Sequence, residues 1–492
     1  MQPVSRRYGV RVCGALFWLV AAALGADDEQ RIRRVEQGLL PTRALQSQPW
    51  TPQRLADRMD FHKVPGVGIA VIRDSRIEWE RGYGVVEAGG SRRITTGTLF
   101  QAGSISKPVA AVAALRLVER GLLHLDEDAN RYLRSWKIPA GGNWQPRVTI
   151  RQLVSHTAGL TVHGFPGYPR DGPIASLVEV LNGGGRANTP PVTVNAIPGT
   201  MFRYSGGGYS VLQQLLIDVT GKPFPALMKE LVLGPLGAHS TYEQPLPSSL
   251  WAVAATGHRA GGKPVAGKWH VYPEMAAAGL WTTPGDLARF AIEIQLALAG
   301  KSEKLLSQKM TRELLTRRMD DVGLGLFLSG VDKSARFGHG GWDEGFVSEM
   351  VAYQQGGLGA VVMSNADVGG SGINPEILRS IAREYAWPDY LPKERVPAAV
   401  AEVAAADHDG TYELRPGVQM VVRRERGRLL LEISGQPPLE LHAGADNLYF
   451  LKEVNAEVQF TMKDGRATGL SFRQGGREMT AVRVGPSSQA GR

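Results

Sequence analysis

The sequence has almost none of the residues that build disulfides and metal sites. Cys13 is the single cysteine among 492 residues and lies in the N-terminal segment that we predict below to be removed, so cysteine nucleophiles, cysteine-ligated metals and disulfides are not expected in the mature chain. The zinc-binding helix pattern His-Glu-x-x-His and the phosphate-binding loop Gly-x-x-x-x-Gly-Lys-Ser/Thr are absent, as is the Gly-x-Ser-x-Gly turn of many hydrolases. No metal or organic cofactor is therefore expected.

The excess of positive over negative charge is also small. Lysine and arginine number 56 against 47 acidic residues, which gives a net charge of +9. No dense basic stripe is interleaved with aromatic side chains, so nucleic acid is not expected as a partner. Hydrophobic residues make up 43% of the chain and charged residues 21%, which is typical of folded globular domains.

The apolar run near the N-terminus, residues 12–24, is shorter than the roughly 20 residues that span a bilayer. Three arginines precede this run, and small residues ending at Ala26 follow it, a pattern typical of a secretory signal. We predict that residues 1–26 are a signal peptide and that the mature protein is exported to the periplasm, with secretion as the alternative. No membrane partner is expected after cleavage, and the choice between general and twin-arginine export stays open.

Hydrophobic periodicity indicates one large mixed domain over residues 27–390. Strand patterns come first and last in this range, with helical patterns between them, which predicts an α/β domain with a helical insertion. Residues 161–200 are rich in glycine and proline and are expected to form a loop over the substrate. The expected strands are 66–72, 76–79, 347–353 and 359–363, and the expected helices are 107–120 and 209–220.

A second, smaller domain is predicted at the C-terminal end. Proline, alanine and charged residues predominate at 391–406, which is interpreted as a linker. In residues 407–485, short alternating runs are separated by turn residues, and this spacing predicts a small all-β barrel or sandwich.

The strongest chemical signal is Ser104 followed three residues later by Lys107, the one Ser-x-x-Lys of the chain. On a helix these two positions face the same way, so a desolvated Lys107 can take the proton of the Ser104 hydroxyl. The start of the helix also favours the negative charge that develops there. Taken alone, the pattern is more typical of a capping serine and a solvated lysine.

Two further segments extend the pattern. Tyr204 lies in Arg-Tyr-Ser-Gly directly before a predicted helix, and His339 lies in Gly-His-Gly-Gly-Trp ahead of predicted strands. With Ser104 and Lys107, this order resembles the serine β-lactamase and penicillin-binding protein superfamily. The tyrosine form looks like its class C branch, which includes esterases and D-amino-acid peptidases.

The resemblance covers roughly residues 45–385 and implies the superfamily's fold. We expect a β-lactamase/transpeptidase-like antiparallel sheet flanked by helices, with a helical subdomain. Residues 407–484 are similar to the small lipocalin-like β-domain appended to many such hydrolases.

The resemblance also implies a role for each catalytic candidate. Ser104 would be the nucleophile that forms an acyl-enzyme, and Lys107 would be its proton partner. Tyr204 would act as the general base or acid. His339 stands at the position of the third-motif lysine, where it would bind a substrate carboxylate or relay a proton to Tyr204.

Substrate contacts are assigned in the same way. The backbone N–H groups of Ser104 and Trp342 would form the oxyanion hole, and Gly340 and Gly341 would let the substrate lie against the strand. The second motif ends in Gly206, where lactamases usually carry an asparagine that contacts the acylamino group. This change, and histidine in place of the third-motif lysine, disfavour an efficient β-lactamase but leave acyl-enzyme formation intact.

These features predict an exported serine acyl-hydrolase for D-amino-acid peptides, small esters or, weakly, β-lactams. The substrate would be a small molecule or peptide, with peptidoglycan fragments among the options. Two alternatives stay open: a dedicated class C-type β-lactamase, and a penicillin-binding or peptidoglycan-sensing module that is acylated without turnover. The acyl substrate, the role of the β-domain and the oligomeric state are not predicted.

Overall fold

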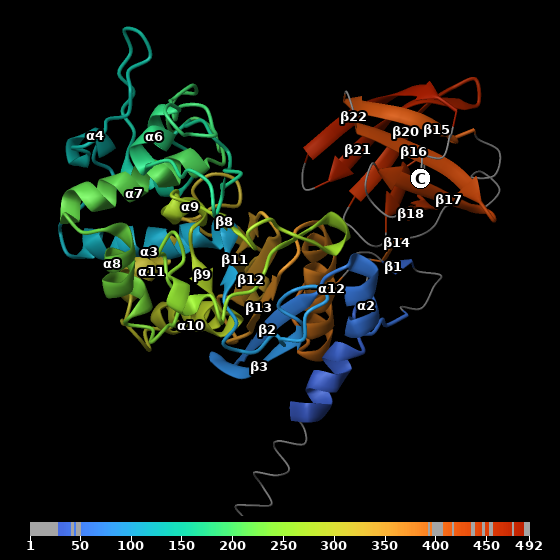
Figure 1. Ribbon diagram of the computed structural model, residues 1–492, viewed down its shortest axis with the longest axis horizontal. Helices are drawn as coiled ribbons and strands as arrows, with labels where there is room; N and C mark the ends of the chain where they lie inside the picture. The colour runs from blue at the N-terminus through green and yellow to red at the C-terminus, as the bar shows by residue number, and fades with distance from the viewer. Residues whose placement is uncertain are drawn as a thin grey trace, which may run out of the picture.

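The computed structural model describes residues 28–40, 44–45, 51–391, 394–395, 407–415, 418–433, 438–444, 448–451, 456–474 and 477–486 (Figure 1). The predicted signal peptide with Cys13 lies outside these residues, as does most of the predicted linker. In the part of the chain that is described, no helix combines the length and the apolar character needed to cross a bilayer.

A six-stranded antiparallel sheet forms the centre of the larger domain, as predicted, with the order β10-β11-β12-β13-β2-β3. The N-terminal hairpin therefore lies beside strands from the far end of the domain, with Gly359 paired to Ile72. The four predicted strands are all present. Their bounds are β2 Gly66–Arg73, β3 Arg76–Gly84, β10 Phe327–Ser329, β11 Arg336–Asp343, β12 Phe346–Tyr353 and β13 Gly359–Ser364.

Both faces of this sheet are covered, because its central strands are apolar on both sides. In β2, Ile69 and Val71 join one hydrophobic cluster, and the alternate residues Ala70 and Ile72 join another. Helices α2 and α12 pack on the first face, and α10 packs on the second (Figure 1). Their bounds are α2 Leu55–His62, α10 Pro284–Leu298 and α12 Val368–Glu384.

The helical subdomain surrounds α3, which is buried on nearly every side. Lys107 is the second residue of this helix, and Ser104 lies in the turn directly before it. Helix α7 starts at the side chain of Ser205, whose hydroxyl accepts the N–H of Gly208, and ends at Gly221 in a left-handed conformation. Both helices were predicted. The subdomain helices are α3 Ser106–Glu119, α4 Ala129–Tyr132, α5 Ile150–Val154, α6 Leu177–Asn182, α7 Gly206–Thr220, α8 Phe224–Met228, α9 Met275–Ala278 and α11 Gln308–Leu314.

Short strands and single-turn helices complete the larger domain. The strand pairs are β1 Ala44–Leu45 with β14 Glu394–Arg395, β4 Phe100–Gln101 with β9 Trp281–Thr282, β5 Tyr168–Pro169 with β8 His270–Val271, and β6 His258–Arg259 with β7 Lys263–Pro264. The single-turn helices are η1 Gly103–Ile105, η2 Lys229–Leu233, η3 Ser248–Leu250, η4 Ala260–Gly262 and η5 Asp332–Ser334.

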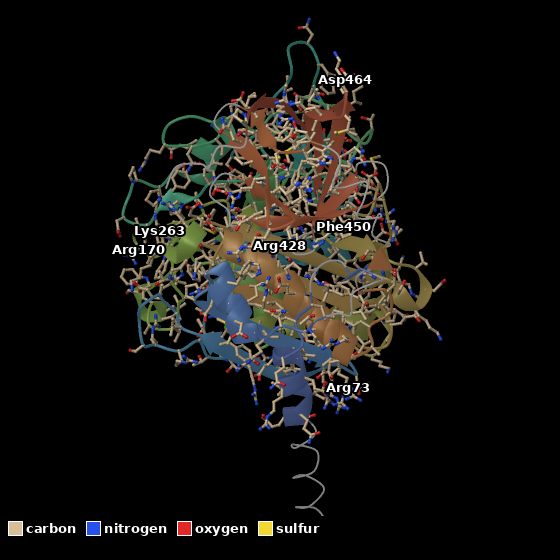
Figure 2. The ribbon with its side chains drawn as sticks, turned by 90° about the vertical axis from the view of Figure 1, so that its right-hand side faces the viewer. Arg73, Arg170, Lys263, Arg428, Phe450 and Asp464 are labelled. Atoms are coloured by element: carbon tan, nitrogen blue, oxygen red, sulfur yellow. The ribbon has the colours of Figure 1, made fainter. Side chains whose placement is uncertain are left out.

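The C-terminal domain is a closed eight-stranded antiparallel barrel, which confirms the predicted all-β unit. Inward-facing side chains such as Tyr412, Tyr449 and Phe460 pack into one cluster inside it. Asp464 lies at the outer tip of the hairpin β20–β21 (Figure 2). The strands are β15 Gly410–Arg415, β16 Val418–Glu425, β17 Arg428–Ile433, β18 Leu439–Ala443, β19 Leu448–Leu451, β20 Ala456–Lys463, β21 Arg466–Gln474 and β22 Arg477–Gly485.

Candidate active site

The turn η1, which carries Ser104, packs directly against strand β11. Gly103 has a left-handed φ of +53°, and a Cβ atom there would collide with the backbone nitrogen of Trp342. A Cβ at Gly341 would collide with the carbonyl oxygen of Ala102. Two glycines therefore allow a backbone-to-backbone approach that brings the nitrogen of Trp342 beside the serine turn.

Lys107 lies about one helical turn after Ser104, at the start of α3, as the spacing predicted. It is buried, with 2% exposure. Its Nζ atom is 2.9 Å from Oγ of Ser104 and donates a second hydrogen bond, of 2.8 Å, to the carbonyl oxygen of Ala277. These two contacts hold the amine against the serine hydroxyl.

Tyr204 lies on the same side of the site, directly before α7. Nζ of Lys107 is 5.0 Å from the centre of its ring. The rings of His339 and Phe327 lie 6.2 Å and 6.3 Å away, the latter nearly parallel to it. The structure thus brings Ser104, Lys107, Tyr204 and His339 together, although 235 residues separate the first from the last.

His339 is buried on β11 beside the short strand β10. Its Nδ1 atom donates to the carbonyl oxygen of Gly340 at 2.5 Å, and its Nε2 atom has no hydrogen-bond partner among the described residues. Burial, reinforced by the positive charge of Lys107, lowers the pKa of His339 to about 3. The imidazole is therefore neutral near pH 7 and offers a proton acceptor rather than a positive charge.

His156 contributes to the site although it belongs to none of the sequence motifs. Its ring stacks on Tyr204 with centroids 4.3 Å apart and 27° between the planes. Its carbonyl oxygen accepts the N–H of Arg203 at 2.7 Å, and its Nδ1 atom accepts the N–H of Ser205 at 3.1 Å. His156 thus holds the backbone on both sides of Tyr204 while its own ring packs on the phenol ring.

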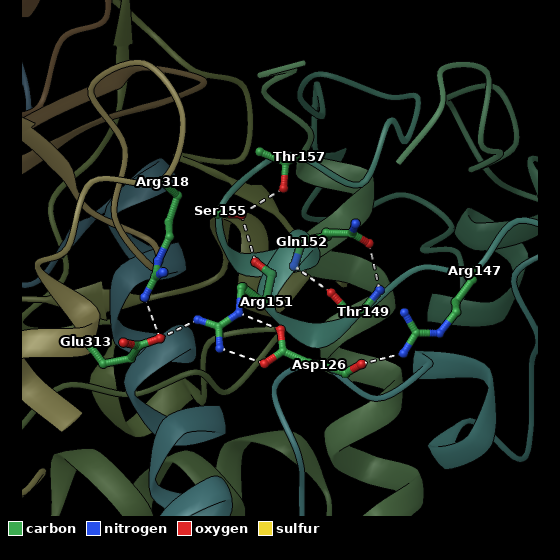
Figure 3. Close-up of polar contacts among 9 residues, drawn as sticks. All are labelled: Asp126, Arg147, Thr149, Arg151, Gln152, Ser155, Thr157, Glu313 and Arg318. Atoms are coloured by element: carbon green, nitrogen blue, oxygen red, sulfur yellow. Dashed lines mark hydrogen bonds and ion pairs between the residues drawn. The ribbon is translucent and has the colours of Figure 1, made fainter. Parts of the chain in front are cut away.

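Helix α5, directly ahead of this histidine, is anchored by a dense set of polar contacts (Figure 3). Thr149 and Gln152 form a reciprocal cap, with each backbone N–H donating to the other side chain. Arg151 binds Asp126 through two hydrogen bonds of 2.6 and 2.8 Å and also pairs with Glu313. The start and the body of the helix that precedes the stacked histidine are therefore fixed.

Gly206, the departure noted in the second motif, faces the loop at 163–165. Its N–H donates to the carbonyl oxygen of His163 at 3.0 Å. A Cβ atom at Gly206 would lie 2.9 Å from Cε2 of Phe165. The ring of Phe165 thus occupies the space that a side chain at position 206 would enter.

The four catalytic candidates, Ser104, Lys107, Tyr204 and His339, line one cleft of about 670 Å³. All eight candidates from the sequence lie at or next to it; Gly206 borders it through Phe165. The described residues hold no group of three or more histidine, cysteine, aspartate or glutamate side chains suited to a metal ion. The lining is Ser104, Lys107, His163, Gly164, Phe165, Phe202, Tyr204, Ala277, Ala278, Phe327, His339, Gly340, Gly341, Trp342, Asp343, Val347, Ser348, Glu349 and Ser371.

Comparison with known sequences matches the beta-lactamase family profile to residues 52–381, the range that contains the whole cleft. The chain belongs to the beta-lactamase family. As a member of this family it is a β-lactamase-related serine hydrolase, and the sequence resemblance to the superfamily is confirmed.

Individual relatives of this family member are distant. Penicillin-binding protein 4* of Bacillus subtilis (strain 168) is 25% identical over 436 residues, which cover 83% of this chain and 92% of the relative. Esterase EstB of Burkholderia gladioli is 31% identical over 183 residues, or 36% of this chain and 46% of the relative. The octameric penicillin-binding protein homologue from Pyrococcus abyssi shares the fold, with a TM-score of 0.58 and 18% identity over 87% of this chain and 98% of that one.

Two buried acids behind the nucleophile were not found from the sequence. Neither Glu274 nor Asp343 has a side-chain hydrogen-bond partner among the described residues. Burial raises the pKa of Glu274 to about 8 and raises that of Asp343 well above its ordinary value, partly offset for Asp343 by Lys107. Glu274 stands directly before α9 and Asp343 is the last residue of β11, and single acids at the ends of elements leave no periodic signal, so only the folded chain reveals this pair.

Proposed function

We propose that the protein is an exported serine acyl-hydrolase that cleaves esters and amides through an acyl-enzyme on Ser104. The observation that carries this is the contact of 2.9 Å between Nζ of Lys107 and Oγ of Ser104, deep in a cleft that also holds Tyr204. The substrates proposed are small esters, D-amino-acid peptides and, weakly, β-lactams. Its place in the class C branch is part of the proposal, as are the signal peptide at 1–26, the periplasmic location and a lipocalin-like character of the barrel.

In the first step, Oγ of Ser104 forms a bond to the substrate carbonyl carbon. The hydroxyl proton passes to Nζ of Lys107 or to the oxygen of Tyr204, and the carbonyl oxygen becomes an oxyanion facing the N–H groups of Ser104 and Trp342. The bond to the leaving alcohol or amine then breaks, and the leaving group takes up that proton.

In the second step, water attacks the acyl carbon while giving a proton to the same base. The bond between Oγ and the acyl group breaks, Ser104 regains its proton, and the carboxylic acid leaves. Overall, an ester and water give an acid and an alcohol. The neutral Nε2 atom of His339 supports a relay role toward Tyr204 better than capture of a carboxylate by charge.

The ester and amide classes are supported by the relatives and by the site. One relative is named an esterase, and another is named a penicillin-binding protein. The missing amide at Gly206 and the neutral His339 disfavour an efficient β-lactamase, since acylamino and carboxylate groups lose their usual contacts.

The experiment mixes protein starting at Asp27 with a p-nitrophenyl ester, a D-alanyl p-nitroanilide and a chromogenic cephalosporin, and records turnover and intact mass. We expect turnover that falls by roughly a thousandfold or more in Ser104→Ala, as when a serine nucleophile is removed. Ser210→Ala in α7 is the matched control and should keep the activity.

Other outcomes identify the alternatives. A cephalosporin preferred by orders of magnitude indicates a dedicated β-lactamase, and a stable adduct without turnover indicates a penicillin-binding sensor. If Ser104→Ala and the unaltered protein behave alike, Ser104 is not the nucleophile.

A further inference from the structure

Aromatic rings line the side of the cleft beside Gly206. This is where the family resemblance leads us to expect a polar contact with the substrate's acylamino group. Phe165 lies against Gly206 so closely that any side chain at position 206 would require the ring to move, since a Cβ would stand 2.9 Å from Cε2 and 3.4 Å from Cδ2. Phe165 itself lines the cleft. An aromatic ring thus replaces the hydrogen-bonding group that could hold an acylamino substituent.

Further aromatic side chains continue this surface. Phe202 and Phe327 meet edge to face at 6.3 Å, and Phe327 lies 5.1 Å from the ring of His339. Phe327 and Trp342 remain 36% and 53% exposed at the mouth of the cleft. Exposed aromatic rings gathered around a concave site are typical of apolar ligand recognition.

The charges in the cleft also disfavour a substrate with a carboxylate. Among the described residues that line it there is no arginine, and its one lysine, Lys107, is engaged with Ser104 and Ala277. The other ionisable lining residues include two acids, Asp343 and Glu349, so a carboxylate on the substrate would meet no cation besides the engaged Lys107 and would lose hydration.

We propose that this site selects acyl groups that are apolar, aromatic or branched, and that carry neither an acylamino substituent nor a carboxylate, with Phe165 and Gly206 as the specificity-determining pair. The proposal rests on the proposed serine hydrolase function and names its substrate class. A group of this kind packs on the rings, whereas an acylamino or carboxylate group would be buried without its hydrogen bonds.

The test uses three p-nitrophenyl esters that share the 3-phenylpropanoyl group and differ in the substituent at its C2 atom. They are 3-phenylpropanoate, N-acetyl-D-phenylalaninate and the monoester of benzylmalonate. Each kcat/KM is divided by the rate of hydroxide-catalysed hydrolysis of the same ester, which removes differences in intrinsic reactivity. We expect 3-phenylpropanoate to be favoured by at least about tenfold over each of the other two, the scale of one mismatched contact in a pocket.

Variants then assign the preference to the pair. Phe165→Ala is expected to lower kcat/KM for 3-phenylpropanoate by roughly 10- to 100-fold, Phe165→Leu by less, and Phe61→Ala, an exposed phenylalanine outside the cleft, not at all. Gly206→Asn alone should impair all three esters, because its Cβ meets the ring. The double variant Phe165→Ala/Gly206→Asn should shift the ratio toward the N-acetyl ester.

The result that overturns the inference is Ser104-dependent turnover with equal or greater preference for the N-acetyl or carboxylate ester. In that case the hydrolase function stands and only the substrate class is wrong. Turnover of these esters that survives Ser104→Ala, or neither turnover nor acyl adduct with any of them, overturns the proposed function and this inference together. If a variant does not fold, the ratios of kcat/KM among the three esters, measured on the unaltered protein, still test the inference.

Discussion

At the scale of single residues, the buried acids behind the serine turn set a stability cost that depends on pH. Glu274 is fully buried, and both of its side-chain oxygens lack hydrogen-bond partners among the described residues. Burial raises its pKa to about 8, whereas in the unfolded chain the group titrates near 4.5. Between these values the folded protein holds a proton that the unfolded chain releases, so stability falls as pH rises through this window.

The substitution Glu274→Gln removes this titration. We expect the variant to gain stability relative to the unaltered protein as the pH rises from about 4.5 to 8, by at most about 1.4 kcal/mol per pH unit. Urea unfolding of both proteins at pH 5 and pH 8 measures the effect. Equal differences at the two pH values would show that Glu274 titrates in the folded protein as it does in the unfolded chain.

At the scale of elements, the proposed catalysis requires η1 to lie close against β11. Gly103 combines a left-handed backbone with contact to the backbone of Trp342. An alanine there would be strained and would also push the strand away from the serine, displacing the proposed oxyanion donor.

We therefore expect Gly103→Ala to reduce kcat by roughly 100-fold or more, the effect of losing one oxyanion donor. Gly121→Ala is the matched control: Gly121 also has a positive φ, of +72°, but nothing lies within 4 Å of an added Cβ. Ester turnover and circular dichroism are measured for both. Similar losses of activity in the two variants would attribute the effect to backbone strain alone.

Elements with strong periodicity could be predicted from the sequence, and so could the residues that the fold brings together in the candidate site. Helices α3 and α7 and strands β2, β12 and β13 lie where the apolar spacing indicated, because each is buried over most of its length. In the range 161–200, expected to be loop, helix α6 nevertheless forms. Its reciprocal cap between Ser176 and Glu179 is a signal that the sequence does carry.

What could not be predicted depends on contacts between distant segments. The stacking of His156 on Tyr204 joins two loops, and the contact of Phe165 with Gly206 joins a loop to a helix start. Neither pair has a spacing that periodicity can reveal. The Ser104–Lys107 pair could be found because both residues lie on one helical turn.

At the scale of the whole molecule, the barrel has a hydrophobic core of its own. Its cluster consists of residues between Tyr412 and Ala481, and no residue of the larger domain belongs to it. None of the residues that line the cleft belongs to the barrel. The two domains should therefore unfold as separate units.

Phe460→Ala tests this separation. Removal of this buried ring should destabilise the barrel by about 3–5 kcal/mol, lower one of two calorimetric transitions and leave ester turnover unchanged. Phe224→Ala, at a buried position of the helical subdomain, should lower the other transition. A single transition shifted by both substitutions would mean that the domains unfold together.

The pairing of β2 with β13 has a consequence for synthesis. The sheet cannot form until Gly359, the partner of Ile72 about 290 residues later in the chain, has been synthesised. A ribosome adds on the order of 5–20 residues per second, so the hairpin β2–β3 spends roughly 15–60 s with one edge unpaired. Throughout that interval the nascent chain cannot complete its central sheet, and the unpaired strand edge stays accessible to chaperones.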